Sequence, residues 1–328
     1  MPTTYTRLHA SLAHAVDALG IDPEQGTVTV GDETISYDSE LHLRRDLSAA
    51  LYRHWHSGSG RRTEARDVRR DHPFEELLRE ATPHRTSRTE AVVRSGLLDG
   101  PLGRHVLFDV GRVRLRIPED EGPRPLPGIG TVTALELPAV RPALSPGFFL
   151  VNGSVGGPAV AGHVLRLYLH LDESATAPTV WQAVLTHLES RSVAYRAKIL
   201  AKAAGYPRRD AIVLYLGPDA WSAVDGVVEA VRHLPGLRSD YSVLTAPITG
   251  GVSYAWDPRD SRIGWDRMSF GQHRTAAIAA AVAAHVYAGA DLHTAVADAL
   301  IESGAEPLAP YRNGDSPQWR PSTAEEVG

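Results

Sequence analysis

The segment HVLRLYLHL, residues 163–171, alternates between apolar and polar side chains from its third residue onwards. Successive side chains of a β-strand point to opposite faces, so this alternation predicts a strand with one face on a core. The apolar face carries four leucines, Leu165, Leu167, Leu169 and Leu171. The other face carries Arg166, Tyr168 and His170, which supply a guanidinium for anions, a hydroxyl and a proton donor. This face is a candidate functional site.

A second segment, AYRAKIL at residues 194–200, repeats the pattern. Its apolar face carries Tyr195, Ala197 and Ile199. The polar face carries Arg196 and Lys198. If both strands belong to one sheet with their polar faces aligned, Lys198 and His170 face the same cleft.

Lysine occurs only twice in the chain, at Lys198 and Lys202, although lysine and arginine together number 34. Arginine cannot be deprotonated in a protein, whereas lysine loses its proton readily when buried. A lysine retained in an arginine-rich sequence is therefore a candidate general base or Schiff-base amine. Lys198 lies inside the predicted strand and is the better candidate, while Lys202 lies beyond it, where we expect it to meet solvent or a phosphate.

The composition restricts the class of protein. The chain has 328 residues, 43% of them hydrophobic and 22% charged, which is ordinary for a globular protein. A net charge of -5 argues against a general binder of nucleic acid or of an anionic membrane. The absence of cysteine excludes disulfides, thiolate nucleophiles and cysteine-based zinc sites. With no predicted membrane span or signal peptide, we expect a cytoplasmic protein.

The pattern along the chain predicts an α+β fold with a central mixed sheet flanked by helices. We expect a helical N-terminal region and strands within residues 1–140, which complete the cleft or bind a leader peptide. The second domain, 141–313, contains four predicted strands, two amphipathic helices and a nearly apolar helix that ends at Gly289. Residues 314–328 are expected to form a flexible tail.

Several arginines accompany the predicted strands. Arg208 and Arg209 precede the apolar run AIVLYL, and Arg274 stands in SFGQHR before the apolar helix. Backbone amides at a helix N-terminus favour an anion, to which Gly271 would allow close approach. We therefore predict a phosphate site formed by planar guanidinium groups, with Lys202 as a further cation.

The sequence also resembles a known family. The matching segments are GFFLVNGS, RLYLHL, AYRAKIL followed by YPRRDAIVLYL, and SFGQHR, within residues 145–313. In their order and spacing they resemble the HopA family, which is named for a plant-pathogen type III effector. That family includes stand-alone lyases of class V lanthipeptide and related biosynthesis, themselves distantly similar to the OspF-type phosphothreonine lyases.

The resemblance implies elimination of phosphate from phosphoserine or phosphothreonine in a ribosomal precursor peptide, which leaves dehydroalanine or dehydrobutyrine. It places the general base on Lys198 and the general acid on His170. Tyr168 replaces a lysine of the distant relatives and would orient phosphate or assist proton transfer. Phosphate would be bound by the surrounding cations, namely Arg166, Arg196, Arg208, Arg209, Arg274 and Lys202. No cofactor or metal is required, and the implied partners are a kinase that phosphorylates the peptide and a cyclase.

Other interpretations remain open. Lys198 as a Schiff base would give an aldolase-type enzyme, which needs no phosphate site. A non-catalytic effector-like binding protein, or a scaffold for a partner kinase, would not use Lys198 at all. His54 and His56 in YRHWH lack an acidic or cysteine partner at ligand spacing, which favours an aromatic surface over a metal site. The glycine-rich stretch at 153–162 lacks the GK[ST] ending of a P-loop.

Overall fold

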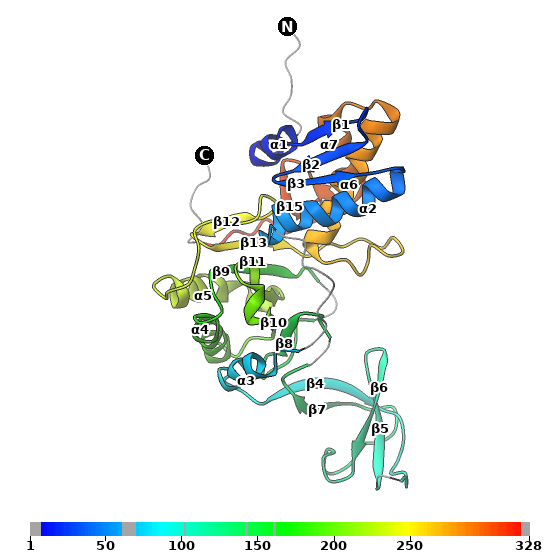
Figure 1. Cartoon of the computed structure of the whole chain (residues 1–328). Coiled ribbons are helices and arrows are strands. Elements are labelled where there is room, and N and C mark those ends of the chain that lie inside the picture. Colours follow the sequence, from blue (N-terminus) through cyan, green and yellow to red (C-terminus); the bar gives the residue numbers. More distant parts are fainter. Residues whose placement is uncertain (1–7, 61–69, 102, 142–143, 160–161, 323–328) are drawn as a thin grey trace.

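The computed structural model describes residues 8–60, 70–101, 103–141, 144–159 and 162–322. Its centre is a six-stranded sheet with the strand order β12-β13-β9-β11-β10-β8 (Figure 1). The strands are β8 (Phe148–Asn152), β9 (Leu165–Leu171), β10 (Tyr195–Leu200), β11 (Arg208–Leu216), β12 (Ala246–Thr249) and β13 (Val252–Trp256). The predicted α+β class is confirmed, but every neighbouring pair in this sheet is antiparallel, so the sheet is not mixed.

One face of the six-stranded sheet packs on helices α4 (Ala177–Ser190) and α5 (Val224–Val231). The four leucines of β9 are fully buried here, together with Trp181 of α4. The predicted apolar faces of β9 and β10 therefore both lie in one core, as the alternation requires. Because neighbouring side chains on a strand alternate, the polar side chains of β9 and β10 must point to the opposite face.

The opposite face is partly covered by helices from both ends of the chain (Figure 1). They are α1 (Ala10–Asp17), α2 (Glu40–Leu51), the π-helical turn η1 (Tyr52–Ser57), α6 (Phe270–Ala288) and α7 (Leu292–Glu302). Leu47 of α2 and Ile278 of α6 belong to the same buried cluster. This core therefore draws on residues from both sides of the predicted boundary at 140.

The N-terminal region contains strands as well as the predicted helices. It contains a three-stranded antiparallel sheet formed by β1 (Gly20–Asp22), β2 (Thr27–Val30) and β3 (Glu33–Ser36). The chain reverses between β2 and β3 at Gly31, whose φ of +61° lies in the left-handed region that glycine adopts most easily. Val28 and Val30 are buried on one side of β2, so the sheet contributes to the core that α2 and α6 share.

A four-stranded sheet projects from the body of the molecule (Figure 1). Its strands are β4 (Thr86–Val93), β5 (His105–Val110), β6 (Val113–Pro118) and β7 (Val132–Pro138), in the order β6-β5-β4-β7. Six apolar residues, among them Phe108, form its own small core. The remaining elements are α3 (His72–Glu80), η2 (Ala203–Gly205), η3 (Pro218–Ala223), β14 (Ala305–Glu306) and β15 (Ala309–Asn313).

Helix α6 begins earlier than predicted. Ser269 is its N-cap and forms a capping box with Gln272, so the helix starts at Phe270 and Arg274 lies inside it. Its predicted end is confirmed, because Gly289 caps the helix with a φ of +68°. In the part of the chain that the structure describes, neither α6 nor any other helix is long and apolar enough to cross a membrane.

The segment 57–72 is rich in charge and glycine, which predicts an exposed loop, but its residues 61–69 lie outside the described part of the chain. The segment 142–147 is predicted to be a hinge, and its residues 142 and 143 also lie outside the described part. The start of the predicted tail at 314–328 is packed. Trp319 contacts the rings of Trp221, Tyr254 and Trp256, with centroids 5.9–6.4 Å apart. Residues 323–328 lie outside the described part.

Candidate functional site

The polar side chains of three neighbouring strands share one face of the six-stranded sheet. Lys198 of β10 pairs with Val213 of β11, which in turn pairs with Tyr168 of β9. Directly paired residues point to the same side of a sheet, and two strand spacings amount to about 10 Å. The next row along the strands contains Arg196, Tyr215 and Arg166 in the same order.

Lys198 is half-buried and lies between two aromatic rings. Its Nζ is 4.2 Å from the ring centroid of Phe148 and 5.9 Å from that of Tyr215. A cation over an aromatic face is attracted by the ring electrons, so these rings orient the side chain without using its hydrogen bonds. The ammonium group therefore keeps its donors available for a ligand.

Arg166 and Tyr168 lie at the centre of this face and are both buried. Arg166 forms an ion pair with Asp257, with 2.5 Å between Nη2 and Oδ1, and its guanidinium lies 4.8 Å from the ring centroid of Tyr215. Its Nε and the Tyr168 hydroxyl have no hydrogen-bond partner within the described residues. Burial raises the pKa of Tyr168, so the side chain is a neutral phenol. The two side chains also act on each other, because the Arg166 guanidinium opposes the rise in the pKa of Tyr168.

His170 is held by Asp240 in the loop before β12. Its Nδ1 lies 3.0 Å from the backbone carbonyl oxygen of Asp240 and 3.0 Å from the carboxylate Oδ1. Because a carbonyl can only accept, Nδ1 carries the proton and Nε2 remains for other contacts. Burial lowers the pKa of His170, and the charge of Asp240 opposes this effect. The charges of Arg209 and Arg238 lower this pKa further.

A second histidine, His56, lies close to this face. The sequence pattern around it favoured an aromatic surface. His56 lies in η1, with its Nδ1 3.2 Å from Ser242 Oγ and its ring 5.3 Å from that of Tyr168. Burial lowers its pKa to about 4, and the charges of Asp210, Arg208, Arg166 and Lys198 act on it. The sequence did contain a signal that His56 is helical, because the helix pattern continues through YRHWH to Gly58. That pattern does not show which side of the helix is buried.

Arg208 already has a carboxylate partner. It donates two hydrogen bonds to Asp210, from Nε at 2.7 Å and from Nη2 at 2.8 Å, and a third to the Tyr52 hydroxyl at 3.2 Å. Burial by itself raises the pKa of Asp210, but the Arg208 guanidinium holds it well below its usual range. A phosphate would have to share Arg208 with this carboxylate. The predicted phosphate ligand is thus also one half of a buried ion pair.

Arg209 also has internal partners in the folded chain. Its Nε donates to Asp240 at 2.9 Å and its Nη1 donates to the carbonyl oxygen of His54 at 2.9 Å. Arg209 therefore connects the loop that holds His170 to η1. Lys202 lies after β10, outside the strand face, and its predicted contact with phosphate stays a prediction.

Arg274, which the sequence predicts as a phosphate ligand, has its donors occupied inside the fold. Arg274 is completely buried and donates to the carbonyl oxygens of Pro310 and Arg312 and to Asn313 Oδ1. These bonds attach α6 to β15 and leave no open fork for a ligand. Gly271, which the sequence suggested would allow an anion to approach, instead makes room for His56, because an added Cβ would lie 2.2 Å from His56 Cδ2. The glycine allows His56 to pack against the helix.

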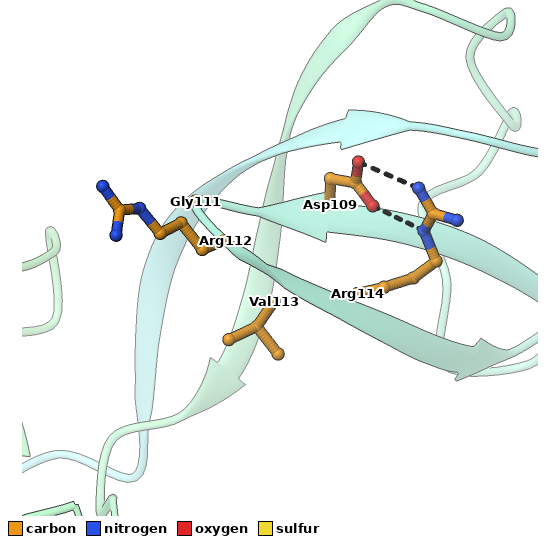
Figure 2. Close-up of a pocket in the computed structure, with 5 residues that line it drawn as sticks. All are labelled: Asp109, Gly111, Arg112, Val113 and Arg114. Carbon is orange, nitrogen blue, oxygen red and sulfur yellow. Dashed lines mark hydrogen bonds and ion pairs between the residues drawn. The ribbon is translucent and has the colours of Figure 1, made fainter.

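A surface hollow elsewhere in the molecule is separate from this face. Figure 2 shows it at the turn between β5 and β6, where Asp109, Gly111, Arg112, Val113 and Arg114 line it. Asp109 accepts hydrogen bonds from Arg114 and also from Arg94, so its carboxylate is already paired. No predicted site residue lines the hollow. Across the described residues, no group of three histidine or acidic side chains is arranged to hold a metal ion.

Two solved structures of bacterial effectors resemble the chain. The effector protein from Pseudomonas syringae pv. tomato strain DC3000 has 17% identity and a TM-score of 0.41, over 51% of this chain and 62% of that one. The effector protein from Pseudomonas syringae pv. syringae strain 61 has 13% identity and a TM-score of 0.45, over 84% of this chain and 90% of that one. The chain thus spans less than two thirds of the first effector.

Comparison with curated protein sequences gives no match. The sequence profile of the HopA1 effector protein family matches residues 139–312, which is more than half of the chain. The matched region contains the six-stranded sheet, α6 and the polar face of Lys198. The chain belongs to the HopA1 effector protein family.

Proposed function

We propose that this protein is a lyase that eliminates phosphate from phosphoserine or phosphothreonine of a ribosomal precursor peptide, after a partner kinase has phosphorylated it. One observation carries the proposal: Lys198, Tyr168, Arg196 and Arg166 lie in two adjacent rows on one face of the sheet. A base and cations for a phosphate are groups that this elimination uses, and the proposed acid, His170, is two residues after Tyr168 on the same strand. The resemblance to HopA-type lyases is consistent with these roles.

In the proposed reaction, the Lys198 amine removes the proton from Cα of the phosphorylated residue. The electron pair of the Cα–H bond forms the Cα–Cβ double bond, and the bond between Cβ and the bridging oxygen breaks. The phosphate leaves with the electrons of that bond and is stabilised by cations on the face. His170 in its charged form donates a proton to the bridging oxygen; burial lowers its pKa, and the Asp240 carboxylate at 3.0 Å opposes this shift. The products are inorganic phosphate and a dehydroamino acid.

The two histidines differ in their fitness for the acid role. His56 has a pKa near 4, so it is neutral at pH 7 and has no extra proton to donate. Its ring lies against Tyr168, where it limits how the phenol can move. We therefore assign His56 to positioning Tyr168 and keep His170 as the proposed acid.

The test uses Lys198→Ala and Lys198→Arg with a synthetic phosphopeptide. We expect both variants to lose about 10²–10⁴-fold in the rate of elimination, because arginine keeps its charge but cannot accept a proton. Mass spectrometry should show phosphorylated peptide accumulating instead of its dehydrated product. Fluorescence anisotropy measures peptide binding separately, so that a loss of affinity is not mistaken for a loss of chemistry.

Arg232→Ala is the matched control, since Arg232 is solvent-exposed and pairs with Glu229 on α5, against the other face of the sheet. It should keep the wild-type rate. If Lys198→Arg retained most of the rate, Lys198 would not be the base. If wild-type protein bound the phosphopeptide but never dehydrated it, a non-catalytic binding protein or kinase scaffold would be the better description.

A further inference from the structure

The row of side chains that contains Lys198 and Tyr168 continues across the edge of the sheet to Arg141. Val140 forms a bridge with Val151 of β8, and the Arg141 amide donates to the carbonyl oxygen of Leu150. Leu150 pairs with Lys198. Val140 packs on the core with α4 and α5, so by alternation Arg141 points to the other face, where Lys198 lies.

Arg141 and Arg196 lack acidic partners, unlike the other arginines of this face. The half-buried guanidinium of Arg141 donates to the Thr89 hydroxyl at 3.3 Å. Arg196 is exposed and donates from Nε to Asn152 Oδ1 at 3.0 Å. Among the residues that the structure describes, neither guanidinium forms an ion pair with a carboxylate. Burial lowers the pKa of Arg141, and the charge of Arg196 acts in the same direction.

The three arginines nearby that were also predicted to bind phosphate each have a carboxylate partner. Arg166 is paired with Asp257, Arg208 with Asp210 and Arg209 with Asp240. Two like charges held together, one of them partly buried, are unfavourable until an anion neutralises them. A phosphate monoester carries about two negative charges and three acceptor oxygens, and so it fits two planar guanidinium groups well.

We propose that Arg141 and Arg196, which lie on the same face as Lys198, in its row and two residues along its strand, bind the phosphate group of a phosphorylated peptide. Arg196 is two residues from Lys198 on the same strand face, about 7 Å away, and Arg141 is two strand spacings away, about 10 Å. Arginine side chains of this length reach a common oxyanion beside the lysine. This inference rests on the proposed function, because it places the phosphate where Lys198 can act on the adjacent Cα.

The experiment measures binding of a fluorescent phosphopeptide and of the same peptide without phosphate. Lys198→Ala serves as the background, so that no elimination occurs during the measurement. Arg141→Gln and Arg196→Gln should each weaken phosphopeptide binding about 10–100-fold, as expected for a lost charge-assisted contact. Binding of the unphosphorylated peptide should not change, and neither should either affinity in Arg232→Gln. Circular dichroism and Tm confirm that each variant is folded.

Competition with inorganic phosphate tests whether the site binds free phosphate or the phosphate group of a peptide. If it competes with the phosphopeptide, and Arg141→Gln weakens both ligands, the site recognises the phosphate group itself, as proposed. Unchanged phosphopeptide affinity in folded Arg141→Gln and Arg196→Gln overturns the proposal. Binding of inorganic phosphate without any preference for the phosphopeptide also overturns it, because the peptide would then not be the source.

The test of this phosphate site and the test of the lyase activity can fail independently. Arg141-dependent binding of the phosphopeptide by a wild-type protein that never dehydrates it would support this site and refute only the lyase activity. Dehydration at the wild-type rate and affinity in Arg141→Gln would support the lyase and refute this site.

Discussion

Replacing Asp210 by asparagine should strongly destabilise the protein. The Asp210 side chain is 3% exposed and that of Arg208 is 18% exposed, and two hydrogen bonds of 2.7 and 2.8 Å join them. Removing one partner of a buried ion pair costs about 3–5 kcal/mol, because the other charge stays buried without compensation. Asparagine can still accept one of the two bonds, so we expect the lower end, about 3 kcal/mol of unfolding free energy.

Urea denaturation followed by circular dichroism measures this loss. The control is Asp172→Asn, which removes an exposed ion pair to Arg238 with a distance of 3.3 Å. A surface pair of this kind contributes about 0–1 kcal/mol, so the control should unfold almost like wild type. The double variant Arg208→Met with Asp210→Leu should lose less stability than Asp210→Asn alone, because no uncompensated charge remains.

The pH dependence gives an independent check on the same pair. The pKa of Asp210 is lowered on folding, so its stabilisation is fully present above the unfolded-state pKa of about 3.9 and is lost as pH falls below it. The difference between wild type and Asp210→Asn should therefore be constant above about pH 5 and shrink below about pH 4. A loss under about 1 kcal/mol at pH 7, or a difference that does not shrink in acid, would refute the assignment of a buried ion pair.

Two further changes test how His56 is packed. Gly271→Ala should lower stability by about 1–2 kcal/mol, because the new Cβ would lie 2.2 Å from His56 Cδ2. The control Gly96→Ala, where the new Cβ would have no atom within 4 Å, should be neutral. Thermal unfolding measures both variants, and equal Tm values would contradict the close contact. The pKa of His56 is lowered to about 4, so between about pH 4 and 6.5 the unfolded chain binds a proton more readily than the folded chain. Wild-type stability should therefore fall as the pH is lowered from about 6.5 to 4. His56→Gln should reduce this slope in urea denaturation, and an unchanged slope would show that His56 is not the group responsible.

The strand faces could be predicted because a period of two residues is a local property of the chain. The alternation in β9 and β10 placed Tyr168 and Lys198 correctly on polar faces, and Gly289 identified the end of α6. The start of α6 was also readable, since Ser269 and Gln272 have the spacing of a capping box, but the apolar run drew attention to later residues.

The partners of each charge could not be predicted from local pattern. Arg141 reaches the Lys198 row only because its segment pairs with β8, which itself pairs with β10. Asp210 stands two residues after Arg208, yet strand alternation alone does not reveal that their side chains form a bidentate pair beneath Tyr52. Which arginines are occupied and which remain open is decided by strand order and by helices distant in sequence.

The core shared by α2 and α6 has a consequence for synthesis of the chain on the ribosome. These helices contact each other, and the Ser48 hydroxyl lies 3.3 Å from that of Thr275. Roughly 220 residues separate the end of α2 from the start of α6, which at about 5–20 residues per second is a delay of about 10–45 s. Throughout that interval the apolar side of α2, including Leu43 and Leu47, lacks its final partner. The N-terminal segment emerges first but completes its packing among the last, so nascent chains are exposed to aggregation and to chaperones at that end.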